Sequence, residues 1–284
     1  MAPLAEQLAG KRVALAMSSG FFGFYHHGGV LRALCEVSIR PCALSGTSAG
    51  SIVAGLHAAG LDPDQIQTEM GRIRRADFWD MRFPFSRHGT GLIAGGRFGA
   101  LLSRILPVHR FEDCPIPVHL GVYRIRDGRT LTLARGSLIE AIRASCAVPY
   151  MFAPVLIDGE AYLDGGLAEK TPLAPFIDAP DIDAVLVSRL PPREDTGGKA
   201  RKSGLFSGLS FGLDTPLEER IERDRRAVAL LRERGKRVHV LAPSRIWLGP
   251  FSLHKATEAA EHAYRATMTL LTSPDAKLGC PDLA

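Results

Sequence analysis

The feature that constrains the fold most is the pentapeptide Gly46-Thr47-Ser48-Ala49-Gly50, which lies between an apolar run and a helix-forming run. Residues 41–44 lead into it, and residues 51–56 leave it with helical spacing, so the pattern predicts a strand, a tight turn and a helix. A Cβ at Gly46 or Gly50 would collide where the strand and the helix fold back on each other. Such a turn holds the serine in a strained conformation above the sheet edge.

The pentapeptide alone permits two interpretations of Ser48. The amino end of a helix carries a partial positive charge, which favours a developing alkoxide and an oxyanion beside it, so Ser48 is a candidate nucleophile. Serine is also a common helix-capping residue, and an isolated G-x-S-x-G sequence fits that simpler role better. The rest of the chain has to decide between them.

Strands and helices alternate along most of the chain, which predicts an α/β three-layer sandwich with helices on both faces of a mostly parallel central sheet. A hairpin is expected around Asp127-Gly128, where residues 118–123 and 130–133 both have strand character. At 284 residues the chain fits a single domain, residues 1–284. Its expected parts are a core over about 12–190, a mobile loop over 191–215, and a helix, strand and helix within 216–284.

Residues 18–23 form a loop of mostly small residues between the first predicted strand and helix. Such a loop presents backbone N–H groups that bind anions or oxyanions. It lacks both the G-K-[ST] ending of a nucleotide-binding loop and the G-x-G-x-x-G spacing of a dinucleotide site. His26 and His27 follow it, and at the start of a helix they are expected to pack or cap more often than to act as base or ligand. No metal and no cofactor are expected.

Asp164-Gly165-Gly166 stands at the end of a predicted strand. The two glycines let the backbone turn sharply and leave room beside the carboxylate. Asp-Gly-Gly is common in ordinary turns, so this tripeptide does not identify a site by itself.

Charge and composition limit the partners. The formal net charge of +5 and the pI near 9.1 permit a nucleic acid or an anionic membrane. No arginine run alternates with aromatic residues and no nucleic-acid motif is present, so no nucleic-acid partner is expected. Five widely spaced cysteines are typical of reduced thiols, and no signal peptide or membrane-spanning stretch is recognised. The sequence predicts a cytoplasmic protein that makes peripheral contact with membranes.

Two segments have open roles. Residues 77–99 are rich in arginine, glycine and aromatic residues, and form either a surface cover over the sheet edge or a lid or apolar wall of a site. Within the loop 191–215, five apolar residues make contact with lipid one interpretation: Leu205, Phe206, Leu209, Phe211 and Leu213.

The order of these features resembles the patatin-like phospholipase family over about residues 13–172. The resemblance is carried by the small-residue loop, by G-T-S-A-G, by the stretch S-C-A-V-P-Y-M-F-A-P-V at residues 145–155, and by D-G-G. It implies hydrolysis of a lipid or other ester through an acyl-enzyme, with a Ser–Asp dyad and no histidine base. Ser48 would be the nucleophile and Asp164 the group that orients and deprotonates it. Backbone N–H groups of Ser19, Gly20 and Phe21 in the loop would form the oxyanion hole. Four glycines would support the two motifs: Gly46, Gly50, Gly165 and Gly166.

An aspartate near its ordinary pKa of about 3.9 is a weak base. A partly desolvated site would raise that pKa, and a short hydrogen bond to Ser48 would help the proton transfer. The loop departs from the family pattern, which is a run of glycines followed by x-R-G. Two of those glycines are serines here, and Phe22 occupies the arginine position.

Two alternatives stay open. The first is a Ser–His–Asp hydrolase in which Asp164 is the acid and His239 or His254 the base. The second is a catalytically weakened scaffold that keeps the fold while its altered loop no longer holds an oxyanion.

Overall fold

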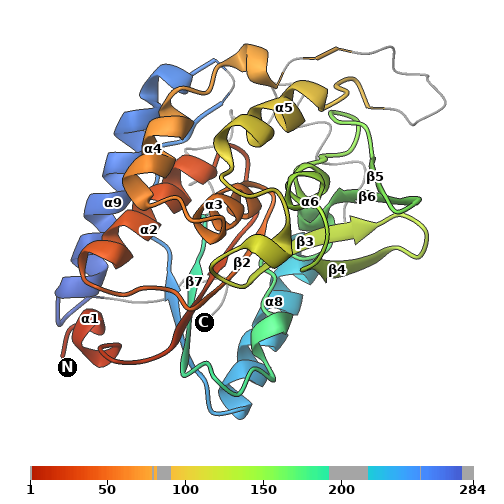
Figure 1. Ribbon diagram of the computed structural model, residues 1–284. Helices are drawn as coiled ribbons and strands as arrows, with labels where there is room; N and C mark the ends of the chain where they lie inside the picture. The colour runs from red at the N-terminus through yellow and green to blue at the C-terminus, as the bar shows by residue number, and fades with distance from the viewer. Residues whose placement is uncertain (1, 79, 82–90, 192–216, 250, 277–284) are drawn as a thin grey trace.

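The computed structural model describes residues 2–78, 80–81, 91–191, 217–249 and 251–276. Within them, eight strands form one sheet in the order β5-β6-β3-β2-β1-β7-β8, with β4 paired to β3 (Figure 1). The strands are β1 (Val13–Met17), β2 (Ala43–Thr47), β3 (Val118–Arg124), β4 (Arg129–Leu133), β5 (Val155–Ile157), β6 (Glu160–Asp164), β7 (Ala184–Ser188) and β8 (Arg237–Leu241). Strands β3, β2, β1, β7 and β8 are parallel. The mostly parallel sheet expected from the sequence is confirmed.

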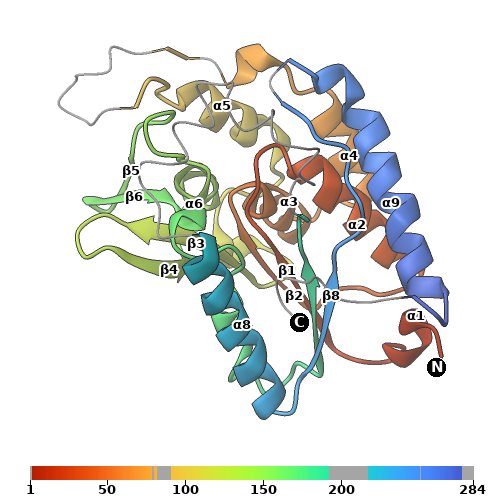
Figure 2. The same ribbon diagram turned by 180° about the vertical axis from the view of Figure 1, so that it is seen from behind.

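Helices cover both faces of the sheet, with α8 on one face and α2, α3, α4 and α9 on the other (Figures 1 and 2). The helices are α1 (Leu4–Gln7), α2 (Phe24–Glu36), α3 (Ala49–Ala58), α4 (Pro63–Gly71), α5 (Gly96–Ile105), α6 (Leu138–Ser145), α8 (Leu217–Glu233) and α9 (Ala256–Thr272). The expected three-layer arrangement is therefore confirmed.

Strand β1 shows why the sheet lies between two layers. Val13, Leu15 and Met17 pack in the larger core with α2 and α3, whereas Ala14 and Ala16 pack in a second core with Val228 and Leu231 of α8. Alternate residues of a strand point to opposite faces, so a strand covered on both sides reads as a continuous apolar run.

Two segments with expected roles lie partly outside the described residues. They are the loop 191–215, of which only residue 191 is described and whose five apolar residues are not, and the segment 77–99. None of the described helices is long and apolar enough to cross a membrane. Four of the cysteines are described, and all four are free thiols: Cys35, Cys42, Cys114 and Cys146.

The pairing register of β3 brings two distant strand ends together. Residues 118–121 of β3 pair with β2, residues 122–124 pair with β6, and residues 120–124 pair with β4. A strand has two edges, and β4 overlaps both other partners, so β2 and β6 share the opposite edge. They run toward each other: Thr47 at the end of β2 pairs with Gly121, and Asp164 at the end of β6 pairs with Val122. The residue after β2 therefore meets the last residue of β6.

The glycines of the strand–helix turn are required by close packing. A Cβ on Gly50 would lie 2.3 Å from the carbonyl oxygen of Met17, and a Cβ on Gly46 would lie 2.3 Å from the carbonyl oxygen of Gly50. Neither contact can be relieved by turning a side chain, because each involves backbone. The expectation that strand and helix leave no room for a Cβ is confirmed.

Gly50→Ala is expected to destabilise the protein by about 1–3 kcal/mol or more, because α3 must move away from β1 to admit a methyl group. Gly71→Ala is the matched control: it lies at the end of α4 with no heavy atom within 4 Å of the added Cβ, so its effect should be neutral or slightly stabilising. Urea unfolding of both variants measures the difference. Equal stability of the two variants would contradict this account of the turn.

Candidate active site

Ser48 adopts the strained geometry expected of a nucleophile turn. Its backbone has φ 53° and ψ −118°, a conformation that costs a non-glycine residue about 1–3 kcal/mol. It stands directly before α3, yet its side chain makes no capping hydrogen bond to that helix. The capping interpretation of Ser48 is therefore wrong for the hydroxyl group, which stays available for chemistry.

Polar groups of α3 and of the end of α6 hold the Ser48 backbone in place. The Ser48 amide donates to Oγ of Ser145 at 2.9 Å, and that hydroxyl donates to the Gly121 carbonyl at 2.7 Å. The Ser48 carbonyl accepts from the Ser51 hydroxyl at 2.6 Å and from the Cys146 thiol at 3.3 Å. Burial raises the pKa of Cys146 strongly, so the thiol stays protonated. Ser145 and Cys146 belong to the sequence stretch before Asp164, but their role as supports of Ser48 is visible only in three dimensions.

Asp164 is a buried carboxylate that faces Ser48. The residue is 5% exposed, its Oδ1 accepts from the Gly166 amide at 2.8 Å, and its own amide donates to the Ala147 carbonyl. Burial raises its pKa to about 6, while a hydrogen bond from the Ser48 hydroxyl, the Gly166 amide and the charge of Arg220 act in the opposite direction. Such a carboxylate is a stronger base than an exposed aspartate and is still ionised at neutral pH.

The turn after Asp164 is fixed by its glycines and by Arg220. A Cβ on Gly165 would lie 2.7 Å from the Gly121 carbonyl, and one on Gly166 would lie 2.8 Å from the Ser19 hydroxyl. Arg220 of α8 donates from Nη1 to the Gly166 carbonyl at 2.8 Å. No sequence signal identifies Arg220, because it lies in a charged helix whose composition indicates only a solvated face.

The loop 18–23 lies beside Ser48, and its amides are not equivalent. The Ser19 amide donates to the Lys170 carbonyl at 2.7 Å, so it already has an acceptor away from the cavity. The Gly20 amide donates to no acceptor within the described part of the chain, and Gly20 and Phe21 both line the cavity that contains Ser48. Phe22 takes the left-handed conformation of this loop, with φ 50°. Of the three expected oxyanion residues, Gly20 and Phe21 line the cavity, whereas the Ser19 amide is directed to Lys170.

A guanidinium reaches this loop from a distant part of the chain. Arg245 donates from Nη2 to the Phe21 carbonyl at 3.4 Å and stacks on the Trp247 ring at 3.5 Å. Burial lowers the pKa of Arg245 to about 10, so it remains a cation at neutral pH. Arg245 thus braces the loop in which Phe22 occupies the expected arginine position. No sequence signal identifies it, because the residue that it contacts is 224 positions away.

Ser48 opens into an apolar cavity of about 90 Å³. Phe22, Phe78, Phe98 and Phe152 form aromatic walls, and Ala49 at the first turn of α3 lies beside Ser48. Phe78, Ile93 and Phe98 come from segment 77–99, so the described part of that segment is a wall of the site. A cavity with one polar end and apolar walls fits an acyl group beside the Ser48 hydroxyl.

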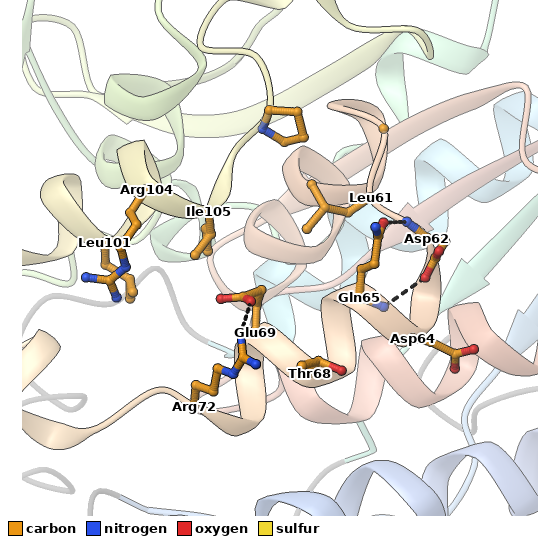
Figure 3. Close-up of a pocket in the computed structure, with 12 residues that line it drawn as sticks. Leu61, Asp62, Asp64, Gln65, Thr68, Glu69, Arg72, Leu101, Arg104 and Ile105 are labelled. Carbon is orange, nitrogen blue, oxygen red and sulfur yellow. Dashed lines mark hydrogen bonds and ion pairs between the residues drawn. The ribbon is translucent and has the colours of Figure 1, made fainter.

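A larger hollow of about 740 Å³ lies elsewhere, between α4 and α5 (Figure 3). Its polar side chains mostly serve the helices that carry them: Arg72 pairs with Glu69 at 2.7 Å, and Asp62 and Gln65 form the capping box of α4 (Figure 3). It contains neither Ser48 nor Asp164. The smaller apolar cavity is therefore the better candidate site.

Within the described residues, none of the histidines considered from the sequence hydrogen-bonds to Ser48 or Asp164. His27 is fully buried with both ring nitrogens bonded, to Ser188 and to the Ser18 carbonyl, each at 2.8 Å, which fits the expected packing role. His239 lies in the middle of β8, and His254 is exposed in a short 3₁₀ helix, Leu253–Lys255. Neither is among the groups that shift the pKa of Asp164. Within the described ranges no three metal-ligating side chains gather.

Comparison with known proteins places these residues in a family context. The model of the family "Patatin-like phospholipase" matches residues 15–177, which contain Ser48, Asp164 and the loop 18–23. An uncharacterized NTE family protein of Mycobacterium tuberculosis is 32% identical over 178 residues, which cover 62% of this chain and 49% of the relative. Lysophospholipase NTE1 of Cryptococcus neoformans is 28% identical over 181 residues, which cover 62% of this chain and 11% of that protein. The chain thus spans at most about half the length of these relatives.

One solved structure gives a weaker likeness. The crystal structure of VipD from Legionella pneumophila has a TM-score of 0.48 and 14% sequence identity, with 93% of this chain and 67% of that chain covered.

Asp164→Asn is expected to stabilise the fold in a pH-dependent way. Because the folded state raises the pKa of this carboxyl from its usual value near 4 to about 6, ionisation opposes folding as pH rises through that window. The asparagine variant avoids a cost of up to about 3 kcal/mol above pH 6, of which roughly half remains at pH 5. Urea unfolding at pH 5 and pH 8 measures it.

The matched control is Asp127→Asn, an exposed carboxylate whose pKa is lowered by a hydrogen bond from Arg124. It should show no such gain. An equal gain for Asp164→Asn at both pH values would contradict the idea that a buried charge at Asp164 opposes folding.

Proposed function

This chain belongs to the patatin-like phospholipase family, and we propose that it is a serine acyl hydrolase that cleaves lipid acyl esters through a Ser48–Asp164 dyad. The observation that carries the proposal is the buried carboxylate of Asp164, with its raised pKa, facing the hydroxyl of a strained Ser48 at the mouth of an apolar cavity. A serine nucleophile requires a base beside its hydroxyl, and a carboxylate with a raised pKa can act as that base.

In the acylation step, Oγ of Ser48 attacks the ester carbonyl while its proton passes to the Asp164 carboxylate. The carbonyl oxygen becomes an oxyanion, which the amides of Gly20 and Phe21 and the amino end of α3 would stabilise. One such donor typically lowers the barrier by about 3 kcal/mol. When the tetrahedral intermediate collapses, the proton on Asp164 passes to the leaving alcohol, and the acyl group stays on Ser48.

Deacylation repeats these roles with water. Asp164 takes a proton from the attacking water, a second oxyanion forms in the same place, and Oγ of Ser48 leaves with the proton returned by Asp164. Each proton that enters the carboxylate leaves it again, so the enzyme is regenerated without another base. Burial supports this cycle, because a pKa near 6 lies close enough to neutrality for the carboxylate both to accept and to release a proton.

The proposed substrates are lipid acyl esters whose acyl chain enters the cavity beside Ser48. The cavity walls are mostly aromatic and aliphatic, which suits a hydrocarbon chain and offers little to a charged group. The similarity to a lysophospholipase supports a lipid ester over a small polar one. We also propose that the protein is cytoplasmic and meets its substrate through peripheral contact with a membrane.

Ser48→Ala and Asp164→Asn are each expected to reduce hydrolysis of a p-nitrophenyl ester by a factor of about 10³ or more, because the two residues act as one unit. His239→Ala and His254→Ala should keep the activity. A fluorophosphonate probe should label the wild type and not Ser48→Ala.

Two results would contradict the dyad. Loss of activity in either histidine variant would favour the Ser–His–Asp arrangement. If the probe does not label the folded wild-type protein, the remaining interpretation is the catalytically weakened scaffold.

The dependence of kcat/KM on pH is expected to rise to a plateau with a midpoint near pH 6, because Asp164 must be ionised to accept the proton. Arg220→Gln should move the midpoint upward, since the charge of Arg220 lowers the pKa of Asp164. Arg223→Gln, three residues along the same helix and paired with Glu219 on the surface, is the matched control and should leave the midpoint in place. An unchanged midpoint in Arg220→Gln would remove Arg220 from this role.

A further inference from the structure

The large apolar side chains exposed on the surface are concentrated around one opening. Among the described residues, nine large hydrophobic side chains are exposed, and six of them are linked to the cavity of Ser48. We call these six the apolar rim: Phe21, Met81, Leu92, Tyr150, Trp247 and Phe251. The other three, Ile125, Leu156 and Leu230, lie near the β3–β4 turn, in β5 and in α8. Scattered apolar residues need no explanation, but a gathering around a cavity indicates an interaction site.

Four of the six rim residues line the cavity or are joined to its wall by backbone contacts. Phe21 lines the cavity itself. Met81 forms a β-bridge with Ile93, a residue of the cavity wall. The Leu92 amide donates to the Tyr150 carbonyl at 3.2 Å, which ties these two rim residues together next to Ile93 and Met151 of the wall.

Trp247 and Phe251 join the rim through arginines. Trp247 stacks under Arg245, which bonds to the Phe21 carbonyl. The ring of Phe251 lies 5.6 Å from the guanidinium of Arg75, in the 3₁₀ helix Arg75–Asp77 that precedes Phe78 of the cavity wall. The segment before α9 and this 3₁₀ helix meet at the upper end of the molecule in both ribbon views (Figures 1 and 2).

Positive charge accompanies the rim. Arg74, Arg75 and Arg97 line one exposed hollow beside it. Two carboxylates of the same region, Asp77 and Asp80, accept hydrogen bonds from backbone amides of Arg74, Gly95 and Arg97. The rim therefore combines exposed aromatic rings with guanidinium groups, in a chain whose formal net charge is +5.

We propose that the apolar rim and the arginines Arg74, Arg75 and Arg97 dock on a lipid–water interface that carries anionic headgroups, with the mouth of the Ser48 cavity turned toward the lipid. Aromatic side chains with one polar and one apolar end favour the interfacial region of a bilayer. Basic side chains beside them add attraction to anionic headgroups. The inference rests on the proposed function, since docking in this orientation lets an acyl ester pass from the surface into the cavity without crossing water.

Charge complementarity favours a lipid surface over a second protein as the occupant. Arg74, Arg75 and Arg97 gather in one hollow beside the apolar rim, so a second copy of this chain that docked through the same face would bring like charges together. A membrane surface offers both an apolar interior for the aromatic rings and negatively charged headgroups for the guanidinium groups.

The test is cosedimentation with vesicles of phosphatidylcholine alone and of phosphatidylcholine with phosphatidylglycerol, performed in the Ser48→Ala background to prevent hydrolysis. Binding should be stronger to the anionic vesicles and should weaken as salt is added. The double variant Met81→Ala/Phe251→Ala removes the two most exposed rim residues and should weaken the partition by about tenfold or more. The matched control Leu156→Ala/Leu230→Ala removes two exposed apolar residues outside the rim and should bind like the parent.

Charge is tested in the same way. Arg74→Gln/Arg75→Gln should lose the preference for anionic vesicles and keep binding to neutral ones, whereas Arg225→Gln/Arg226→Gln on the exposed side of α8 should keep the preference. Equal binding by the rim and control variants would overturn the proposal. So would a dimer in solution that Met81→Ala/Phe251→Ala dissolves, because the rim would then be an interface between copies.

Hydrolysis of a water-soluble p-nitrophenyl ester, measured in the Ser48-containing protein, separates this proposal from the proposed function. Met81→Ala/Phe251→Ala should keep that activity and lose activity on vesicle substrate. If the soluble ester is not hydrolysed but vesicle binding follows the rim, the catalytic proposal fails and the docking face stands.

Discussion

The site depends on one constraint of the sheet, which is that β2 and β6 approach each other along the same edge of β3. Because the two strands run in opposite directions, their last residues meet, and the side chains of Ser48 and Asp164 face each other across the gap. Three of the motif glycines, Gly46, Gly50 and Gly165, lie where one backbone passes another at close range, and a Cβ on Gly166 would meet the Ser19 side chain. The register of β3 therefore sets the relative position of Ser48 and Asp164.

The same meeting places a carboxylate where water has little access, and this has opposite effects on stability and chemistry. A buried ionised group opposes folding, yet the desolvation that raises the pKa of Asp164 also strengthens it as a base. The strained backbone of Ser48 adds a second local cost. The packing of a large surrounding core offsets both costs. All five residues of β1 and all five of β7 are buried in it.

Local features of the site could be predicted from the sequence, and non-local ones could not. The turn around Ser48 follows from glycine spacing and from the apolar runs on either side, and the sharp turn after Asp164 follows from its two glycines. The bond from Ser19 to Lys170, the support of Ser48 by Ser145, and the reach of Arg220 and Arg245 into the site all depend on tertiary pairing. A single sequence carries no local pattern for them, because a charged helix is expected to face solvent.

Arg220 and Arg245 both lie beyond residue 177, where the match to the family model ends. These two bracing side chains are therefore encoded in a different stretch of the chain from Ser48 and Asp164. Substitutions in α8 or in the segment before α9 can alter the basicity of Asp164 or the stiffness of the loop 18–23 while both motifs stay intact. Two relatives with identical motifs can thus differ in activity, and the motifs alone are an incomplete guide to how well such a site works.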